Sequence, residues 1–525
     1  MRFFNTEGPV NPSDHYCLPP LQRLDLDELM ILIERKKYFV LHAPRQTGKT
    51  SALLALMKHL EADGRYRCAY ANFEVGQSAR EDVGAAINAI LAELASRAKR
   101  ILQDGFVDEI RSQVLARSGP HAAFGEVLAQ WSENSSRPLV LLIDEIDALV
   151  GDTLIAVLRQ LRAGYTWRPA QFPQSVILCG VRDVRDYRIH SSSQKEVITG
   201  GSAFNIKAES LRLGDFDRRE VEALYRQHTE ETGQAFADEA LEEAWRLTQG
   251  QPWLTNALAY QCCFRDKAGR DRGRPVSAEM VDQAKEDLIL RRDTHLHQLA
   301  DKLEEERVRR VIAPLLSGRE IQEEIPPDDL EYVRDLGLIR PTHPIEIANP
   351  IYREIIPRQL TYTIEARIVQ DPARYVRQDG SLDLEKLLLA FRDFFRMHSE
   401  HWGQMFGYRE AGPQLLMQAF LHRIVNSGGR VEREYGLGRG RTDLLAIWPH
   451  PGGEQRAVIE LKILRGDLER TIQDGLEQTL EYMDRCGAEE GHLVIFDRGG
   501  GKSWEERLFR RREEQRGRTI LVWGM

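Results

Sequence analysis

A short loop between an apolar segment and a helical pattern restricts the fold of this chain more than any other feature. Residues Tyr38 to His42 form an apolar run typical of a buried strand, and Ala43-Pro-Arg-Gln-Thr-Gly-Lys-Thr50 follows directly. A helical pattern over Ser51 to Leu60 comes next. Backbone N–H groups at a helix N-terminus, together with a cation, suit the negative charge of phosphate groups. The spacing therefore predicts a phosphate-binding loop within an α/β fold.

The last three residues of the loop have the types that nucleotide chemistry requires. We expect Gly48 to let the backbone approach the phosphates, Lys49 to reach the outer phosphates, and Thr50 to ligate Mg²⁺ through its hydroxyl. Ala43 stands where this motif usually begins with glycine, so the backbone there must adopt a conformation that a Cβ tolerates. The expected nucleotide-binding residues of the loop are Ala43, Arg45, Gln46, Thr47, Gly48, Lys49 and Thr50.

A second apolar strand ends in two carboxylates. The run Pro138-Leu-Val-Leu-Leu-Ile-Asp-Glu145 places Asp144 at the carboxyl end of a buried strand, where it can hold Mg²⁺ through water. Glu145 would then polarise the water that attacks the outer phosphate. Alternatively, both carboxylates only cap the following helix. The phosphate-binding loop favours the metal and catalytic roles.

Two arginines near this expected site allow two interpretations each. Arg182 follows the strand Ser175 to Cys179, and the corresponding strand end of phosphate-loop ATPases faces the outer phosphate. Arg182 therefore either senses ATP against ADP or pairs on the surface with Asp183 or Asp186. Arg45 lies inside the loop and contacts either the nucleotide or a neighbouring subunit.

The chain of 525 residues is long enough for several domains, and its periodicity changes along its length. Short apolar strands alternate with helices up to about Gly214, which predicts a parallel sheet with helices on both faces. A wholly helical pattern follows, then two helices and a hairpin that suggest a winged helix, and then a second α/β pattern. The expected domains are residues 1–214 (P-loop ATPase domain), 215–299 (helical lid), 300–360 (winged helix), 361–383 (linker) and 384–525 (second α/β domain).

Three segments resemble a known family of prokaryotic ATPases. They are Arg45-Gln-Thr-Gly-Lys-Thr50, Leu142-Ile-Asp-Glu145 and Thr248-Gln-Gly-Gln-Pro-Trp-Leu254. They resemble the AAA-like, STAND-related archaeal-type ATPases, and the resemblance covers about Asp14 to Leu360. It implies an ASCE-type P-loop fold with a helical lid and a winged helix, often used as a switch.

The resemblance also implies that a glycine-proline turn of the lid lies near the nucleotide base. This role falls on Gly250 and Pro252, although Gln249 replaces the first of the family's two glycines. The alternative interpretation of Gly250-Gln-Pro252 is a simple helix break.

The C-terminal unit carries a second group of chemically matched residues. Asp443 is followed, after sixteen intervening residues, by Glu460-Leu-Lys462. Residues two apart on a strand share a face, so Glu460 and Lys462 point away from the apolar side of their strand. The turn at His450-Pro-Gly-Gly-Glu454 pairs two strands antiparallel and brings Asp443 beside Glu460. Two carboxylates and one ammonium predict a Mg²⁺ site for phosphodiester hydrolysis, with an ordinary solvated strand face as the alternative.

These residues resemble the PD-(D/E)XK nuclease superfamily over roughly Leu384 to Met525, with the order helix, three strands, helix, strand. Gln478 and Tyr482 lie one helical turn apart and resemble a QxxxY element that assists the metal site or DNA in some branches. Glu410 is the candidate for an acidic residue on the first helix. The expected catalytic residues are Glu145, Asp443, Glu460, Lys462, Gln478 and Tyr482, and the expected metal ligands are Thr50, Asp144, Asp443 and Glu460.

Two further segments have ambiguous roles. The basic run Arg507-Leu-Phe-Arg-Arg-Arg512 either contacts phosphates or forms a solvated helix, and the interspersed glutamates favour the helix. The winged helix either contacts DNA or packs structurally, and the acidity of Asp328-Asp-Leu-Glu331 favours packing.

Composition limits the partners and the location. The formal net charge of −9 argues against coating of nucleic acid by bulk charge, so any such contact must be local. No apolar run approaches the roughly 18 residues of a membrane span, and the N-terminus lacks a secretory signal. The six cysteines include no CxxC pair. We therefore expect a cytoplasmic protein with free thiols and no membrane partner.

Taken together, the motifs predict a protein that binds and hydrolyses ATP, uses ATP and Mg²⁺, and thereby controls a Mg²⁺-dependent nuclease in DNA defence or repair. The expected partners are nucleic acid, with DNA favoured over RNA, and further copies of the chain in a nucleotide-dependent homo-oligomer. The alternative is a STAND-like signalling or assembly switch whose C-terminal domain binds nucleic acid or a partner without cleaving it.

Overall fold

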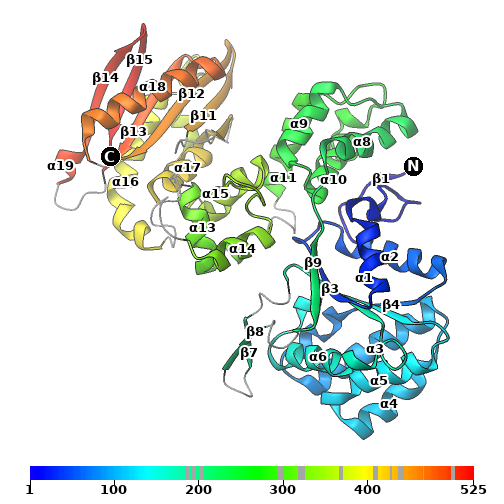
Figure 1. The fold of residues 1–525 in the computed structure, drawn as a ribbon. Coiled ribbons are helices and arrows are strands. Elements are labelled where there is room, and N and C mark those ends of the chain that lie inside the picture. The colour runs from blue at the N-terminus through cyan, green and yellow to red at the C-terminus, as the bar shows by residue number, and fades with distance from the viewer. Residues whose placement is uncertain are drawn as a thin grey trace. The chain divides into compact units, whose positions relative to one another are not determined.

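The computed structural model describes residues 1–183, 188–191, 196–199, 205–291, 301–316, 325–365, 371–405, 412–425, 428–434, 443–464, 466–497 and 503–525. The chain divides into two compact units. Unit 1 comprises Met1–Leu290 and Arg334–Ile339, and unit 2 comprises Arg291–Val333 and Arg340–Met525. Each unit contains its own large sheet (Figure 1).

Unit 1 is built on a five-stranded sheet in which every pairing is parallel. Its strands in spatial order are β4 (Arg67–Asn72), β5 (Leu139–Asp144), β6 (Ser175–Gly180), β3 (Tyr38–His42) and β9 (Lys207–Arg212). Because β3 and β5 both flank β6, the carboxyl ends of these three strands meet at one edge of the sheet. The parallel sheet expected from the sequence is confirmed.

Alternate strand residues of unit 1 enter two separate cores, as a sheet covered on both faces requires. Helices α3 (Val83–Ile101), α4 (Phe106–Ser118), α5 (Pro120–Asn134) and α6 (Gly151–Ala163) cover the face that Val40 and Ile143 enter. Helices α1 (Leu26–Glu34) and α2 (Lys49–Asp63) cover the face that Leu41 and Leu142 enter.

Several elements of this unit were not predicted from the sequence. Helix α4 buries only Val107 and Val114, so its apolar period is weak. Helix α1 begins after Asp25, whose side chain accepts a hydrogen bond from the Glu28 N–H. An antiparallel pair of short strands, β7 (Arg188–Ser191) and β8 (Glu196–Thr199), was also not predicted.

The region after β9 is helical, as expected. It contains α8 (Arg218–Thr232), α9 (Asp238–Thr248), α10 (Pro252–Tyr260) and α11 (Ala278–Arg291). The N-terminal strands β1 (Phe3–Phe4) and β2 (His15–Tyr16) pair in parallel and pack on this helical lid. Arg2 forms an ion pair of 2.9 Å with Glu231 of α8. The first residues of the chain thus contact the lid, which the sequence analysis did not foresee.

The segment expected to be a winged helix contains α13 (Glu306–Leu316), α14 (Pro327–Asp335) and α15 (Pro350–Glu365). The expected hairpin over residues 337–348 is reduced to bridge residues at Ile339 and Ile347. One backbone hydrogen bond of 2.9 Å runs from Arg340 N–H to the Glu346 carbonyl. Helix α15 was not predicted from the sequence, and it extends beyond residue 360, where the winged helix was expected to end.

Unit 2 contains a mixed six-stranded sheet (Figure 1). Its strands in spatial order are β10 (Arg430–Glu434), β11 (Asp443–His450), β12 (Gly453–Ile463), β13 (Glu490–Phe496), β15 (Arg518–Gly524) and β14 (Phe509–Gln515). Strands β12, β13 and β15 pair in parallel, and the other pairings are antiparallel.

The two faces of this sheet are covered by different helices. Ile459 and Leu461 of β12 enter the core formed with α16 (Leu384–Met405) and α17 (Gly412–Val425). Val458 enters the opposite core, formed with α18 (Leu468–Cys486). The alternation along β12 therefore places Glu460 and Lys462 on the α18 side.

The preference for a solvated helix over Arg507 to Arg512 is wrong. Helix α19 (Trp504–Arg507) is short, and Phe509–Gln515 form the edge strand β14, paired antiparallel with β15. Partly buried and exposed side chains alternate along β14, as on a strand. Arg510 forms an ion pair with Glu385, and Arg511 forms one of 2.6 Å with Glu469. These two basic side chains are thus paired within the unit.

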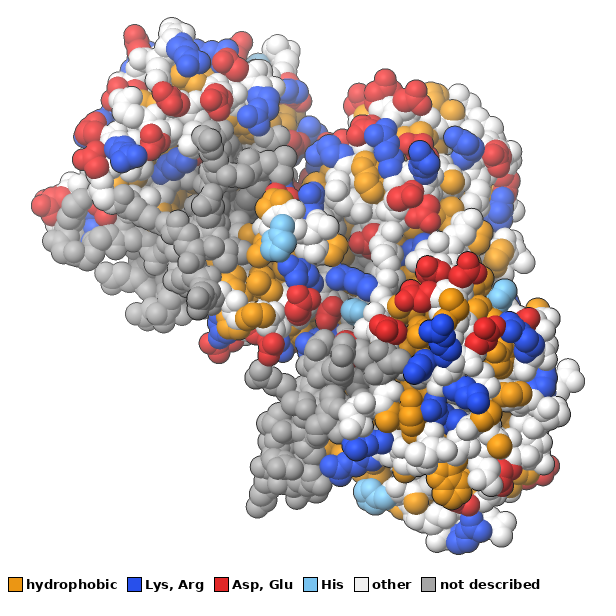
Figure 2. All heavy atoms as spheres, viewed as in Figure 1, with side chains coloured by type: hydrophobic (Ala, Val, Ile, Leu, Met, Phe, Trp, Pro, Cys, Tyr) orange, Lys and Arg blue, Asp and Glu red, His pale blue; other side chains and the backbone are white. Residues whose placement is uncertain are grey.

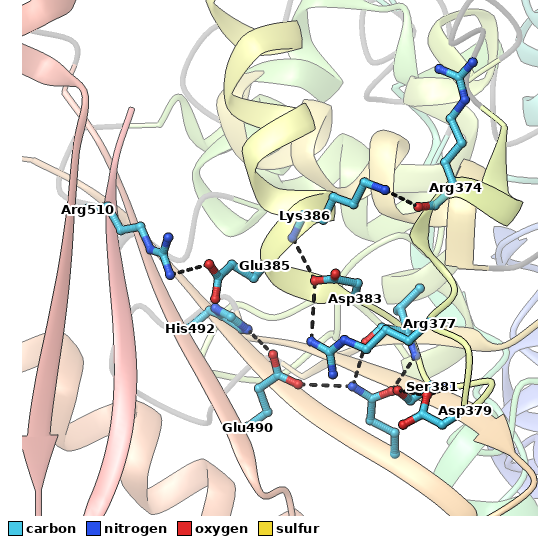
Figure 3. A network of polar contacts seen from close by, with 12 residues as sticks. Arg374, Arg377, Asp379, Ser381, Asp383, Glu385, Lys386, Glu490, His492 and Arg510 are labelled. Atoms are coloured by element: carbon cyan, nitrogen blue, oxygen red, sulfur yellow. Dashed lines mark hydrogen bonds and ion pairs between the residues drawn. The ribbon is translucent and has the colours of Figure 1, made fainter.

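Residues of the expected linker pack onto unit 2. Tyr375 and Leu382 belong to the core under α16 and α17. The Gln455 side chain on β12 donates to the Leu382 carbonyl and accepts from the Leu382 N–H. Gln455 also donates to Glu490, which hydrogen-bonds to His492 at 3.0 Å (Figure 3). This polar network fastens residues 371–383 to the sheet.

The charged surface side chains and the cysteines agree with the composition of the sequence. On the face shown in Figure 2, acidic and basic side chains are interspersed. Within the described residues, no helix is long and apolar enough to cross a membrane. All six cysteines are free thiols, as expected.

Candidate functional site

The phosphate-binding loop and the carboxylate of β5 are in direct contact. The Thr50 hydroxyl donates a hydrogen bond of 2.7 Å to Oδ2 of Asp144, and the Tyr70 hydroxyl donates one of 3.0 Å to the same oxygen. The other oxygen, Oδ1, accepts from the Glu145 N–H at 3.0 Å. Asp144 is fully buried. Its position beside a hydroxyl at a helix N-terminus suits a Mg²⁺ site with a phosphate ligand.

The loop has the backbone shape that its residues predict. Gly48 has φ +91° at the N-terminus of α2, in the left-handed region where glycine is favoured. Gln46 also has a positive φ, whereas Ala43 does not, so an alanine fits the first position of the motif. The Lys49 ammonium donates to the carbonyls of Ala43 and Pro44, both at 2.9 Å. The loop therefore folds around the lysine that is expected to meet the outer phosphates.

Glu145 lies where a general base for water attack is expected. Its backbone has φ +51°, a conformation that non-glycine residues rarely adopt and that often marks functional sites. Burial raises the pKa of its carboxyl, and so do the charges of Asp147 and Asp144, against the opposing charges of Lys49 and Arg45. A base with a raised pKa takes up a proton more readily near neutral pH.

The capping interpretation of the two carboxylates is wrong. Glu145 precedes the short 3₁₀ helix Ile146–Ala148, but its side chain makes no capping hydrogen bond there, and α6 starts only at Gly151, after Val150. Asp147, which the sequence analysis missed, instead accepts a hydrogen bond of 3.1 Å from the Val181 N–H. It thereby ties the end of β5 to the end of β6.

The two ambiguous arginines differ in exposure. Arg182 is buried, which contradicts its placement on the surface, and its Nε lies 3.6 Å from the carboxylate of Asp335. The same carboxylate lies 3.6 Å from Nδ1 of His42. Arg45 is exposed on the loop. The sensing role of Arg182 and the partner of Arg45 remain predictions.

A cleft lies beside the loop. Four residues that the sequence predicts to bind nucleotide line it, and these are Gln46, Thr47, Gly48 and Pro252. Most of the lining residues that were not predicted come from the N-terminal segment, namely Asn5, Thr6, Glu7, Gly8, Val10, Tyr16, Cys17, Leu18, Pro20 and Arg23. The others are Ser51, Phe216, Leu224, Trp253 and Asn256.

Gly250 supports the lid rather than lining this cleft. It has φ +77°, and its carbonyl accepts a hydrogen bond of 2.9 Å from the Phe216 N–H. A Cβ at this position would lie 1.9 Å from the Phe216 carbonyl oxygen. The glycine therefore permits a close backbone approach at the start of the lid, and its neighbour Pro252 begins α10 at the cleft.

The second candidate site lies on β11, β12 and α18 of unit 2. The hairpin pairs Asp443 directly opposite Glu460, as the turn length predicted. Glu460 is fully buried, and the Lys462 ammonium lies 2.8 Å from its Oε1. Lys462 also donates to Oε1 of Gln478 on α18. The structure thus brings Glu460, Lys462 and Gln478 together on one face.

The structure describes the remaining residues of this expected site only in part. Tyr482 is buried in the core beneath the same face, together with Val458. The side chain of Asp443 and the whole of Glu410 lie outside the described residues. Among the described residues, no cluster of three or more His, Cys, Asp or Glu side chains is shaped to hold a metal ion. A metal site here therefore depends on Asp443.

Comparison with known proteins identifies one part of the chain. Residues 33–187 match the family described as an AAA domain. This part of the chain is therefore an AAA-type ATPase domain with a nucleotide-binding function. No curated protein matches the chain.

Three solved structures resemble the chain at low identity. The Walker-type ATPase PABY2304 of Pyrococcus abyssi is 15% identical, with a TM-score of 0.45, over 67% of this chain and 99% of that chain. Cdc6p of Pyrobaculum aerophilum is 14% identical, with a TM-score of 0.36, over 65% and 93%. The RuvB Holliday junction branch migration motor of Thermotoga maritima is 14% identical, with a TM-score of 0.33, over 63% and 93%.

Proposed function

We propose that this chain binds and hydrolyses ATP and that its nucleotide state controls a Mg²⁺-dependent phosphodiesterase, a DNA nuclease, in the C-terminal domain. The observation that carries the proposal is the position of the Lys462 ammonium between Glu460 and Gln478, on the strand that pairs Glu460 with Asp443. Two sites suited to phosphate chemistry therefore occur in one chain.

The ATPase half of the proposal uses the residues around the loop. Thr50 and Asp144 already share a hydrogen bond, and both present oxygen atoms, the ligand type that Mg²⁺ prefers. Lys49 supplies positive charge for the outer phosphates. Glu145 accepts a proton from the attacking water. Bound Mg²⁺ would neutralise charge on the phosphates.

The nuclease half depends on a buried carboxylate with a cationic neighbour. A carboxylate removed from water is unfavourable unless a cation or hydrogen-bond donor compensates it. Lys462 provides this compensation for Glu460. Asp443 occupies the position directly opposite Glu460 on the neighbouring strand. Asp443 and Glu460 would hold Mg²⁺, and Lys462 would orient the water that attacks the phosphodiester.

A cleavage assay tests this proposal. The purified full chain is incubated with supercoiled DNA, linear duplex DNA, single-stranded DNA or RNA, with Mg²⁺ or with EDTA. We expect Mg²⁺-dependent cleavage of DNA, and we expect Glu460→Gln to reduce it by about 100-fold or more, in line with removal of a metal ligand. Glu477→Gln is the matched control, because Glu477 is exposed on α18 next to Gln478.

Two results would contradict the site assignment. Full cleavage by Glu460→Gln would place the chemistry elsewhere. Absence of cleavage on every substrate, together with a mass that changes between ATP and ADP, would favour the alternative of a nucleotide-dependent assembly switch whose C-terminal domain only binds.

A further inference from the structure

One guanidinium joins three segments of unit 1 at this cleft. Arg23 ends the 3₁₀ helix Pro20–Arg23 and lines the cleft beside the phosphate-binding loop. Its Nη1 donates a hydrogen bond of 2.6 Å to the Thr47 carbonyl of the loop. Its Nη2 donates to the Gly214 carbonyl, and its guanidinium carbon lies 4.8 Å from the centre of the Phe216 ring. Arg23 therefore connects the N-terminal segment, the loop and the start of the lid.

Carboxylates act on the charge of Arg23 without accepting a described hydrogen bond from it. Burial lowers the pKa of Arg23 to about 10, although Asp215 and Glu220 attract the cation. The side chain remains charged at neutral pH, and its described hydrogen bonds go to the backbone carbonyls of Thr47 and Gly214 rather than to a carboxylate. Its Nε is buried and has no hydrogen-bond partner. Because desolvating a cation is unfavourable, its place beside an anion-binding loop calls for a specific role.

The residues that Arg23 holds form the connection between the sheet and the lid. At one end, the Leu213 N–H donates to the His42 carbonyl at 3.0 Å, next to the loop. At the other end, the Phe216 N–H donates to the Gly250 carbonyl at 2.9 Å, at the turn before α10. Movement of this connection would therefore shift both α8 and the Gly250 turn. Such short connections between packed elements commonly act as hinges.

We propose that Arg23 is a positioning residue that couples occupancy of the phosphate-binding loop to the position of the helical lid. The inference rests on the proposed binding of ATP in this cleft. Thr47 immediately precedes Gly48 and Lys49, which are expected to meet the phosphates, so a nucleotide that orders the loop also fixes the Thr47 carbonyl. Arg23 transmits this order to Gly214 and Phe216. The bridge needs the planar fork of a guanidinium, because an ammonium is a single point of charge.

Hydrogen exchange measured by mass spectrometry on the full chain tests the coupling. Peptides covering residues 43–52 report the loop, and peptides covering residues 212–220 report the start of the lid. In the parent, we expect saturating MgATP to slow exchange in both. In Arg23→Gln and Arg23→Lys, we expect the loop to keep its protection while the slowing over residues 212–220 falls by about tenfold, the effect of losing a charged hydrogen bond. Arg35→Gln, an exposed arginine, is the matched control.

The possible outcomes separate this inference from the proposed function. If Arg23→Lys retains full protection in both segments, the bridge plays no part and the inference is overturned. If MgATP protects neither segment in the parent, ATP binding itself is contradicted, and the inference falls with it.

A second variant guards against a folding defect. Phe216→Ala removes the stacked ring from the lid side and leaves Arg23 and its bond to Thr47 in place. We expect the same loss of protection over residues 212–220, with kcat for ATP hydrolysis reduced about tenfold and KM changed less than kcat, since lid movement limits turnover in many enzymes. Unchanged kcat and unchanged protection in Phe216→Ala would overturn the coupling.

Discussion

The Thr50 hydroxyl lies 2.7 Å from Oδ2 of Asp144, although the two residues are 94 positions apart in the chain. The contact forms because β5 and β3 flank β6 and end at the same edge of the parallel sheet. It joins two groups that a nucleotide site of this type uses to hold Mg²⁺, a hydroxyl at a helix N-terminus and a carboxylate at a strand end.

The Asp144 carboxylate is expected to be essential for ATP hydrolysis. Asp144→Asn keeps the shape of the side chain but removes its charge, and it replaces one acceptor with a donor beside the Glu145 N–H or the Thr50 hydroxyl. We expect the rate of phosphate release from ATP to fall by about 10- to 100-fold. Asp27→Asn, an exposed aspartate on α1, should leave the rate unchanged. Equal rates in the two variants would exclude Asp144 from the metal site.

The pH dependence of ATP hydrolysis should reflect Glu145. Its pKa is raised by burial and by Asp147 and Asp144, so the carboxylate needed as a base is lost at a higher pH than for an ordinary glutamate. We expect kcat/KM for ATP to fall as the pH is lowered, with a midpoint above the ordinary glutamate value of 4.5. In Glu145→Gln, we expect this pH dependence to disappear along with most of the activity. Protonation of a carboxyl with a raised pKa stabilises the folded state. The loss of activity at low pH is therefore not caused by unfolding linked to Glu145.

Two glycines with the same backbone angle separate strain from steric contact. Gly233 and Gly250 both have φ +77°, but a Cβ at Gly233 meets no atom within 4 Å, whereas one at Gly250 meets the Phe216 carbonyl oxygen at 1.9 Å. We expect Gly233→Ala to destabilise unit 1 by about 1–2 kcal/mol through strain alone. Gly250→Ala should cost about 1–3 kcal/mol more, because the lid turn must shift. Urea unfolding followed by circular dichroism measures both, and equal midpoints would exclude the close approach.

The ion pair between Glu460 and Lys462 should contribute to the free energy of unfolding of unit 2. Glu460 is fully buried and Lys462 lies 2.8 Å away, so Lys462→Met leaves an uncompensated carboxylate in the core. We expect a loss of about 3–5 kcal/mol in the unfolding free energy of unit 2. The double variant Lys462→Met with Glu460→Gln removes both charges and should recover part of the loss. A double variant less stable than Lys462→Met would contradict the pairing.

Local patterns explain how far the sequence predicted these sites. Lys49 and Thr50 belong to one short motif, and Asp443 and Glu460 are related by a hairpin whose turn and alternation fix their register. These relationships depend on neighbours in the chain. The sequence alone therefore predicted these relationships.

Contacts between distant segments explain most of what was missed. Arg23 meets Thr47 and Gly214, which are 24 and 191 positions away, and no periodicity signals such a contact. Strand β14 was mistaken for a helix because its side chains are charged on both faces, where ion pairs to Glu385 and Glu469 replace the usual apolar side. In both cases the partner lies on another element, so the sequence pattern alone carries no trace of it.

The rate of Mg²⁺-dependent DNA cleavage, with and without ATP, tests the central claim most directly. We expect ATP to change the rate of the parent by about tenfold, within the usual range of coupling between two sites. Lys49→Ala should keep the rate seen without nucleotide but lose the response to ATP, whereas Lys58→Ala, an exposed lysine on the same helix, should behave as the parent. A parent that cleaves at one rate in both conditions, or a Lys49→Ala variant that still responds to ATP, would contradict the control of the nuclease by the nucleotide.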